Sequence, residues 1–390
     1  MTPVTLHDGR QPCYYLPHHP VFRESSTTTK TRVVFDGSAK SSNGLSLNDI
    51  LQVGPTVQPD LYSTVLRFRT HQICFTADIA KMYRQILIHP QDRDLQRILW
   101  RYSPDDPVQE YQLNTVTYGT SAAPYLATRC LKKLAEDNQT EFPRAAQALS
   151  QEFYVDDLLS GATTLNEAIQ LQQQLTTLLE TAGFTLRKWA SNSQEFLNTI
   201  SDEYKASTKT LSFDSKDGVT TLGLLWFPDT DHFQVRQNTS AIMCPASNSS
   251  QQVTLQRARP APASNTSQQV PLQRATLHAS TKRQVLRHIA SIFDPLGLLS
   301  PSVIAYKVFL QKLWQDNLLW DEQLTNLRQE EWNQLMLKLP QLTQIRIPRK
   351  VICTNATAIH LHGFCDSSEQ AYGACMYIRS TDQTNQVFSH

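Results

Sequence analysis

The alternation of apolar and polar residues in the first half of the chain predicts strands and helices in mixed order. Polar and apolar residues alternate over 27–36, as they do in an edge strand. Apolar residues recur at helical spacing over 61–68, and the mostly apolar run 71–78 predicts a strand that ends on an acid. A short turn or helical segment is expected over 79–86. The elements belong to both classes, which favours an α+β protein.

The same patterns continue to about residue 380. A turn of small residues after Tyr118 predicts a helix that runs to about Glu136, and the capping box Thr164–Glu167 predicts another that Gly183 ends. Further helices are expected over 281–293, 301–317 and 321–338. Further strands are expected over 86–89, 96–101, 111–117, 184–189, 219–227 (a short hairpin), 359–366 and 372–379.

The segment 237–279 departs from this pattern. It is rich in Ser, Asn, Gln, Pro and Ala and contains no acid. A string that begins at Asn248 returns at Asn265, 17 residues later. Two copies are too few for a repeat fold, so we interpret the segment as a disordered, duplicated insertion.

Two adjacent acids interrupt the apolar run Phe153–Leu159. The strand-forming residues on both sides of Asp156 and Asp157 predict a hairpin whose tip fixes both carboxylates. Asp78, at the end of its own strand, supplies a third carboxylate. An exposed acidic turn is the alternative for the pair, and a helix N-cap is the alternative for Asp78.

Three fixed carboxylates suit Mg²⁺, which prefers oxygen ligands. Two such ions stabilise both the attacking and the leaving oxygen of a phosphoryl displacement, and nucleotide polymerisation is a reaction of that kind. The three acids therefore favour a polymerase that uses two Mg²⁺ ions, with Mn²⁺ as a possible substitute.

Composition adds limits to this interpretation. The 390 residues, 40% hydrophobic and 18% charged, are typical of a globular chain of two or three domains. No apolar run of about eighteen residues and no signal peptide is found, so we expect a cytosolic or nuclear protein. The seven cysteines never occur in Cys-x-x-Cys spacing, which argues against disulfides and zinc.

Net charge alone does not indicate a nucleic-acid binder, because it is only +1. The region 237–350, however, holds 13 Lys and Arg against 6 Asp and Glu. This local excess would suit a phosphate backbone, and a merely solvated surface is the alternative.

Eight strings, in this order, resemble the polymerase region of long-terminal-repeat retrotransposons of the BEL/Pao group. They are TKTRVVFD (29–36), SNGLSLND (42–49), FTADIAKMYRQI (75–86), LNTVTYGT (113–120), FYVDDLLSG (153–161), LRKW (186–189), IFDPLGLLSP (292–301) and HGFCDSSEQAYGA (362–374). The resemblance implies an RNA- and DNA-directed DNA polymerase with a right-hand fold of fingers, palm and thumb, a helical connection and a truncated ribonuclease H-like domain.

The resemblance also assigns roles to single residues. Asp78, Asp156 and Asp157 match the metal-binding acids, and Tyr83 matches the steric gate that excludes a ribose 2′-hydroxyl. Other positions match nucleotide contacts (Lys30, Arg32, Ile79, Met82, Tyr118, Gly119, Val155 and Lys188, the last near a lysine that protonates pyrophosphate), the primer grip (Leu222, Gly223) and the first acid of a ribonuclease H site (Asp366).

The expected organisation is an incomplete N-terminal segment, fingers and palm with the primer-grip hairpin, the insertion, a helical thumb or connection region, and the start of a ribonuclease H-like domain (1–26, 27–236, 237–279, 280–350 and 351–390). The implied partners are an RNA or DNA template-primer and deoxynucleoside triphosphates, with no membrane. The chain is expected to be part of a longer Pol polyprotein that acts in the cytoplasm, free or in a virus-like particle, or in the nucleus.

Two other functions stay open. A catalytically degenerate fragment could bind nucleic acid without polymerising, given the basic region and the incomplete ends. A nuclease built on Asp366 would need further acids beyond residue 390. The family's peptidase label is not carried over, because the sequence shows no matching pair of nucleophiles.

Overall fold

A computed structural model of the chain describes residues 1–4, 12–22, 31–206, 219–221, 224–235, 281–290, 292, 294–342 and 344–390. They form two compact units. The first contains Met1–Gln234, Arg346–Cys365 and Ala374–His390, and the second contains Val235–Ile345 and Asp366–Gly373. Lys30, the pair Leu222 and Gly223, and the expected insertion 237–279 lie outside the described residues.

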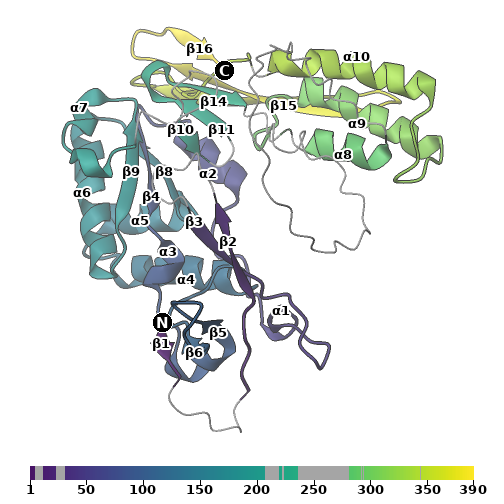
Figure 1. Ribbon diagram of the computed structural model, residues 1–390. Coiled ribbons are helices and arrows are strands. Elements are labelled where there is room, and N and C mark those ends of the chain that lie inside the picture. The colour runs from purple at the N-terminus through teal and green to yellow at the C-terminus, as the bar shows by residue number, and fades with distance from the viewer. Residues whose placement is uncertain are drawn as a thin grey trace, which may run out of the picture. The chain divides into compact units, whose positions relative to one another are not determined.

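A four-stranded antiparallel sheet in the order β7-β8-β4-β9 organises the first unit (Figure 1). Its strands are β4 (Ile73–Ile79), β7 (Phe153–Tyr154), β8 (Asp157–Ala162) and β9 (Leu186–Ser191). Side chains alternate between the two faces of a strand. Phe75, Ala77 and Ile79 of β4 belong to the apolar core, so Asp78 points to the opposite face.

Three helices supply the rest of that core: α4 (Ala123–Asp137), α5 (Pro143–Gln151) and α6 (Leu165–Thr181). The predicted capping box opens α6, since Thr164 accepts from the Glu167 N–H and the Glu167 carboxylate accepts from the Thr164 N–H. The sequence patterns missed α5. It is a helix of nine residues that buries three alanines and one leucine.

The remaining strands of the first unit form smaller sheets. They are β1 (Thr2–Pro3), β6 (Gln109–Gln112) and β5 (Arg97–Trp100) in one sheet, β2 (His18–Phe22) and β3 (Thr31–Phe35) in another, and β10 (Val219–Thr221), β11 (Leu224–Phe227), β12 (His232–Val235) and β13 (Ile347–Pro348) in a third.

Short helices connect these strands. They are α1 (Leu47–Ile50), α2 (Leu61–Phe68), α3 (Met82–Gln85), α7 (Gln194–Leu197) and the 3₁₀ turns Pro90–Gln96, Asp202–Tyr204 and Pro228–Thr230. The predicted strand 86–89 is wrong: only an isolated bridge joins Leu87 to Thr115. Pro90 follows directly, has no N–H to donate to a ladder, and starts a 3₁₀ turn instead.

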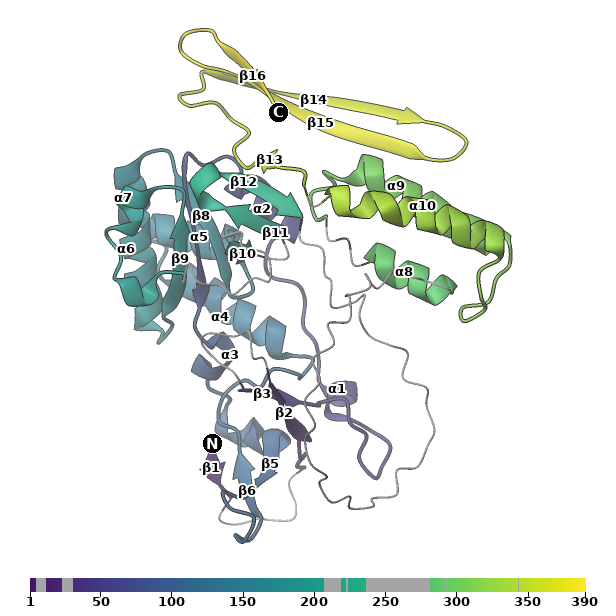
Figure 2. The same cartoon turned by 45° about the horizontal axis from the view of Figure 1, so that its top comes forward.

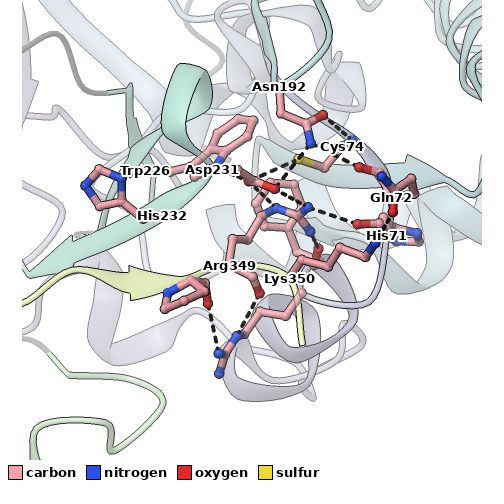
Figure 3. A network of polar contacts seen from close by, with 12 residues as sticks. His71, Gln72, Cys74, Asn192, Trp226, Asp231, His232, Arg349 and Lys350 are labelled. Carbon is pink, nitrogen blue, oxygen red and sulfur yellow. Dashed lines mark hydrogen bonds and ion pairs between the residues drawn. The ribbon is translucent and has the colours of Figure 1, made fainter. Parts of the chain in front are cut away.

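A buried arginine joins β13 to the rest of the first unit, although β13 is more than 100 residues beyond β12 in the sequence (Figure 3). The Arg349 side chain is 0% exposed and donates to both Asp231 carboxylate oxygens, at 2.6 and 2.7 Å. It also donates to the carbonyl oxygens of Phe68 and His71. Asp231 further accepts from Trp226 Nε1, so both charges are well hydrogen-bonded.

The second unit contains the helices α8 (Lys282–Ala290), α9 (Ser300–Gln315) and α10 (Asn326–Leu342). All three are labelled in Figure 2. Trp332, fully buried, packs near Tyr306 and Phe309 in its core. A further sheet, most of whose residues belong to the first unit, has the order β14-β15-β16 and contains β14 (Ala358–Ser367), β15 (Tyr372–Thr381) and β16 (Val387–Ser389). Within the described residues, no helix is both long and apolar enough to span a membrane.

Candidate active site

Two of the three expected acids face each other across one rung of the β4–β8 ladder. The register pairs Asp78 with Asp157. Residues directly opposite in an antiparallel pair share a face and have Cβ atoms about 4.5–5.5 Å apart. Like charges in that position repel. The backbone pairing therefore concentrates negative charge at this end of the sheet.

The third acid, Asp156, lies in the two-residue turn between β7 and β8. Val155, its partner in the turn, has a φ of 56°, which is unfavourable for a β-branched residue. Hydrogen bonds from other segments hold the turn: the Val155 N–H donates to Gln58 Oε1 at 2.8 Å, and the Ile79 N–H donates to the Asp156 carbonyl at 2.9 Å. The second bond joins the turn to the residue after Asp78.

Lys188 brings a positive charge to the site. It follows the β9 residue that pairs with Asp78, has a φ of 56°, and donates from Nζ to Asp78 Oδ2 at 3.0 Å. The lysine side chain is 58% exposed and the Asp78 side chain 19%. The other oxygen, Asp78 Oδ1, is buried without a hydrogen-bond partner among the described residues. Asp78 thus keeps one acceptor oxygen free for a cation.

The pKa values show that the acids interact. Burial, together with the charges of Asp156 and Asp78, raises the pKa of Asp157 to about 7, although the charge of Lys188 opposes the rise. Burial also raises the pKa of Asp156, where the charge of Asp78 adds to the rise and the charges of Lys188 and Arg32 reduce it. Both shifts come first from burial of the carboxyl groups, and the neighbouring acids add to them.

In the part of the chain that the structure describes, no three His, Cys, Asp or Glu side chains converge as a ready-made metal site. The ladder register nevertheless pairs Asp78 with Asp157, and the Ile79 N–H bond to the Asp156 carbonyl joins the adjoining turn to the same end of β4. Lys188 already contacts one oxygen of Asp78.

Arg32 and Tyr83 both interact electrostatically with Asp156. The Arg32 charge acts on the pKa of Asp156 from β3. Tyr83 is half-buried against the core, and burial and the nearby Asp156 raise its pKa. The side chains of Ile79 and Met82 are each 1% exposed and belong to the core, so only their main chains remain available to a nucleotide.

Tyr118 and Gly119 form a turn next to the end of β3. Gly119 has a φ of 96°, and a Cβ atom there would lie 2.3 Å from the Phe35 carbonyl oxygen, so only glycine fits. Asn48 joins the two segments: its Nδ2 donates to the Gly119 carbonyl at 3.2 Å, and its Oδ1 accepts from the Ser121 N–H at 2.7 Å.

Some functional residues were not assigned from the sequence. Asn48 stands in a matching string, yet nothing in its spacing indicated a bridge across 71 residues. Gln58 lies in a segment predicted as a loop, and Arg84 next to Tyr83 carried no signal of its own. Asp366, at the end of β14, is exposed and accepts from the Ser367 N–H.

Comparisons with known proteins agree with the sequence prediction. Residues 25–193 match the family model of reverse transcriptases (RNA-dependent DNA polymerases), and residues 281–390 match that of the Pao retrotransposon-like RNaseH-like domain. No curated protein sequence is significantly similar to the chain. The predicted resemblance is confirmed by these family matches.

Among solved structures, the chain resembles a foamy viral protease-reverse transcriptase in complex with double-stranded DNA. The identity is 13%, the TM-score is 0.51, and the match covers 97% of this chain and 52% of that chain. The chain therefore spans about half the length of that protein. The likeness shows the fold, and it confirms the predicted mixed α+β fold of reverse transcriptases.

Proposed function

We propose that the chain, which belongs to the reverse transcriptase family and carries a Pao retrotransposon-like RNaseH-like region, is an RNA- and DNA-directed DNA polymerase of a retrotransposon. The observation that carries the proposal is the register of Asp78 opposite Asp157, with Asp156 held in the adjoining turn. Deoxynucleotides would be added to a primer 3′-hydroxyl at this end of the sheet.

The residues present fit divalent cations. The buried Asp78 Oδ1 lacks a partner among the described residues. Burial and then the neighbouring acids raise the pKa values of Asp156 and Asp157, and a bound cation would counter both effects. Two Mg²⁺ ions held by these carboxylates would lower the pKa of the 3′-hydroxyl and offset charge on the departing pyrophosphate. Carboxylate oxygens are the ligands that Mg²⁺ prefers.

The neighbouring side chains would bind and orient the nucleotide. Arg32, close enough to influence Asp156, would pair with the triphosphate, because guanidinium groups bind phosphate oxygens bidentately. Lys188 would place its ammonium group beside the leaving pyrophosphate. Tyr83, next to Asp156, would occupy the space of a 2′-hydroxyl and so favour deoxynucleotides.

The direct test is extension of a labelled DNA primer on an RNA template by the full chain in Mg²⁺. Asp156→Asn keeps the shape of the side chain and removes its charge, so extension should fall by about a thousandfold or more. Asp137→Asn is the matched control, because this exposed acid pairs with Lys133 on α4. Equal extension by wild type and Asp156→Asn would reject the assignment.

One observation favours a second function, binding of nucleic acid without polymerisation. Lys188 already occupies Asp78 Oδ2, and the described carboxylates do not form a ready-made metal site. A protein of this kind would bind a labelled primer-template, which fluorescence anisotropy measures. It would add no nucleotide at any concentration of Mg²⁺ or Mn²⁺. Template-dependent incorporation would exclude it.

The proposed setting follows from the family. We place the chain within a longer Pol polyprotein, where a template-primer and deoxynucleoside triphosphates are its partners, in the cytoplasm, free or in a virus-like particle, or in the nucleus. The proposed division into fingers and palm (27–236), thumb or connection (280–350) and ribonuclease H-like start (351–390) keeps the boundaries expected from the sequence. A ribonuclease function at Asp366 would require acids from other segments.

A further inference from the structure

Arg84 forms an unusual contact close to the proposed nucleotide site. It lies in α3, one residue beyond Tyr83, and its guanidinium carbon is 5.2 Å from the centre of the Phe35 ring and 5.1 Å from that of the Tyr118 ring. No ion pair involves Arg84 among the described residues. Its position is therefore set by two aromatic rings.

The two rings also contact each other. Phe35 and Tyr118 are edge-to-face, with centres 5.5 Å apart and planes at 70°. Phe35 is 6% exposed and belongs to a buried cluster that Tyr118 packs against. The core thus fixes the Phe35 ring, which packs against the Tyr118 ring. Arg84 contacts both rings.

The main chain below Tyr118 is held separately. Asn48 binds the Gly119 carbonyl and the Ser121 N–H, and Gly119 approaches Phe35 too closely for any side chain. These contacts fix where the turn lies but leave the Tyr118 side chain free to rotate about its χ angles. The contacts with Phe35 and Arg84 restrict that rotation.

We propose that Arg84 is a positioning residue that holds the Tyr118 ring in place for the sugar and base of the incoming nucleotide. The proposal rests on the function proposed above, in which Tyr118 lines the nucleotide site. A guanidinium group suits this task, since it attracts the faces of aromatic rings and stays charged. An aliphatic side chain would fill the space without that attraction.

Steady-state incorporation of one nucleotide tests this role. Arg84→Met keeps a long side chain and removes the charge, so KM for the nucleotide should rise about tenfold while kcat stays within about twofold, as expected for the loss of one contact of this class. Arg84→Lys keeps a cation and should restore most of the loss. Arg129→Met, which removes an exposed arginine of α4, should leave both constants unchanged.

A double-mutant cycle separates positioning from direct contact with the nucleotide. If Arg84 acts through Tyr118, Arg84→Met has no further effect on KM in a Tyr118→Leu background. An equal effect in both backgrounds would overturn the proposal, and so would a fall in kcat with KM unchanged.

Amide hydrogen exchange gives a readout that does not depend on catalysis. The Ser121 amide is bonded to Asn48 Oδ1, and the Ala123 amide to the Thr120 carbonyl. Because Asn48 holds this main chain independently of Arg84, exchange in a peptide covering 116–123 should stay near wild type in Arg84→Met, while KM rises. Much faster exchange in Arg84→Met would overturn the positioning role even if the chain polymerises, because the substitution would then act on the main chain of the turn and not on the Tyr118 side chain. Loss of the proposed function alone would appear as a wild-type protein that fails to extend primers.

Discussion

The carboxyl groups of Asp78 and Asp157 share one rung of an antiparallel ladder, where like charges are unfavourable. A fold selected only for stability would not place two acids there, beside a third in the turn. The arrangement is instead suited to bind cations. Two predictions at the scale of single residues follow from the charge and the shape of this site.

The first prediction concerns the metal-free protein. Burial and the neighbouring acids raise the pKa of Asp157 from 3.8 to about 7, so between these pH values the folded chain keeps a proton that the unfolded chain has lost. Stability should therefore fall as pH rises from about 4 to about 7 and then level off. Asp157→Asn should reduce this slope and raise the free energy of unfolding at pH 8 by about 1–3 kcal/mol.

Thermal unfolding in chelator across this pH range measures the effect. Asp137→Asn is the control, because Asp137 forms an exposed ion pair at the end of α4. This variant should keep the wild-type dependence of stability on pH. A slope in Asp157→Asn as steep as in wild type would show that this carboxyl is not the group that titrates.

The second residue-scale prediction concerns sugar selection. Tyr83 is half-buried beside Asp156, and its ring would fill the space of a 2′-hydroxyl. Tyr83→Ala should therefore lower discrimination against ribonucleotides by about ten- to hundredfold, whereas Tyr83→Phe keeps the ring and the discrimination. Competition between a deoxynucleotide and the matching ribonucleotide gives the ratio, and an unchanged ratio in Tyr83→Ala would remove the gate assignment.

The roles of individual residues could be predicted from the sequence where an acidic residue interrupts or ends an apolar strand. The acids at strand ends and in the hairpin could be found from the sequence, because an ionised carboxylate is unfavourable within an apolar run. Asn48, Gln58 and Arg84 could not be found in this way. Each acts through contacts with residues distant in sequence, and a polar side chain in a loop carries no periodicity.

At the scale of elements, the β7–β8 hairpin concentrates strain at its turn. Val155 adopts a φ of 56°, a conformation that costs a non-glycine residue about 1–3 kcal/mol. Val155→Gly should remove this cost, and after the entropy loss of glycine the net gain in the free energy of unfolding should be about 1 kcal/mol. Urea denaturation of wild type, Val155→Ala and Val155→Gly measures it.

The same substitution should slow nucleotide incorporation, since a looser turn holds Asp156 less firmly. A Val155→Gly protein that is less stable than wild type would show that the turn is not strained. Val155→Ala serves as the control because it shortens the side chain without permitting the glycine conformation.

Element positions were predictable where apolar spacing was regular. The β4 and β8 strands and the capped helix α6 are found close to their predicted places. The strand predicted over 86–89 is wrong, because Pro90 follows it and starts a 3₁₀ turn. The short helix α5, which buries alanines and one leucine, was not predicted.

At the scale of the whole molecule, the Arg349–Asp231 pair joins two parts of the first unit that are far apart in sequence (Figure 3). Arg349→Met leaves Asp231 largely buried without its counter-charge, so the free energy of unfolding should fall by about 3–5 kcal/mol. Adding Asp231→Asn to that variant removes the unpaired charge and should restore about half of the loss. Chemical denaturation of the single and double variants gives these values.

Arg346→Met is the control for this prediction, because Arg346 is exposed and three residues away. It should change stability by less than about 0.5 kcal/mol. A loss in Arg349→Met no larger than in Arg346→Met would mean that the pair does not join the segments energetically.

Family and fold class could be predicted from the order of short strings, whereas long-range pairing could not. The pairing of β12 with β13, and the contact of Arg349 with the Phe68 carbonyl 281 residues away, leave no trace in local patterns. From the sequence alone, a charged residue is expected to be exposed, because its charge partner is not known. This limit is physical, because burial of a charge depends on contacts that only the folded chain provides.

The most direct test of the central claim is the single-turnover rate at which the full chain adds one deoxynucleotide to an RNA-templated primer in Mg²⁺. The three carboxylates are proposed to act as one site, so Asp78→Asn should lower this rate by about a thousandfold or more, while Asp137→Asn should leave it unchanged. Equal rates for wild type and Asp78→Asn would contradict the account.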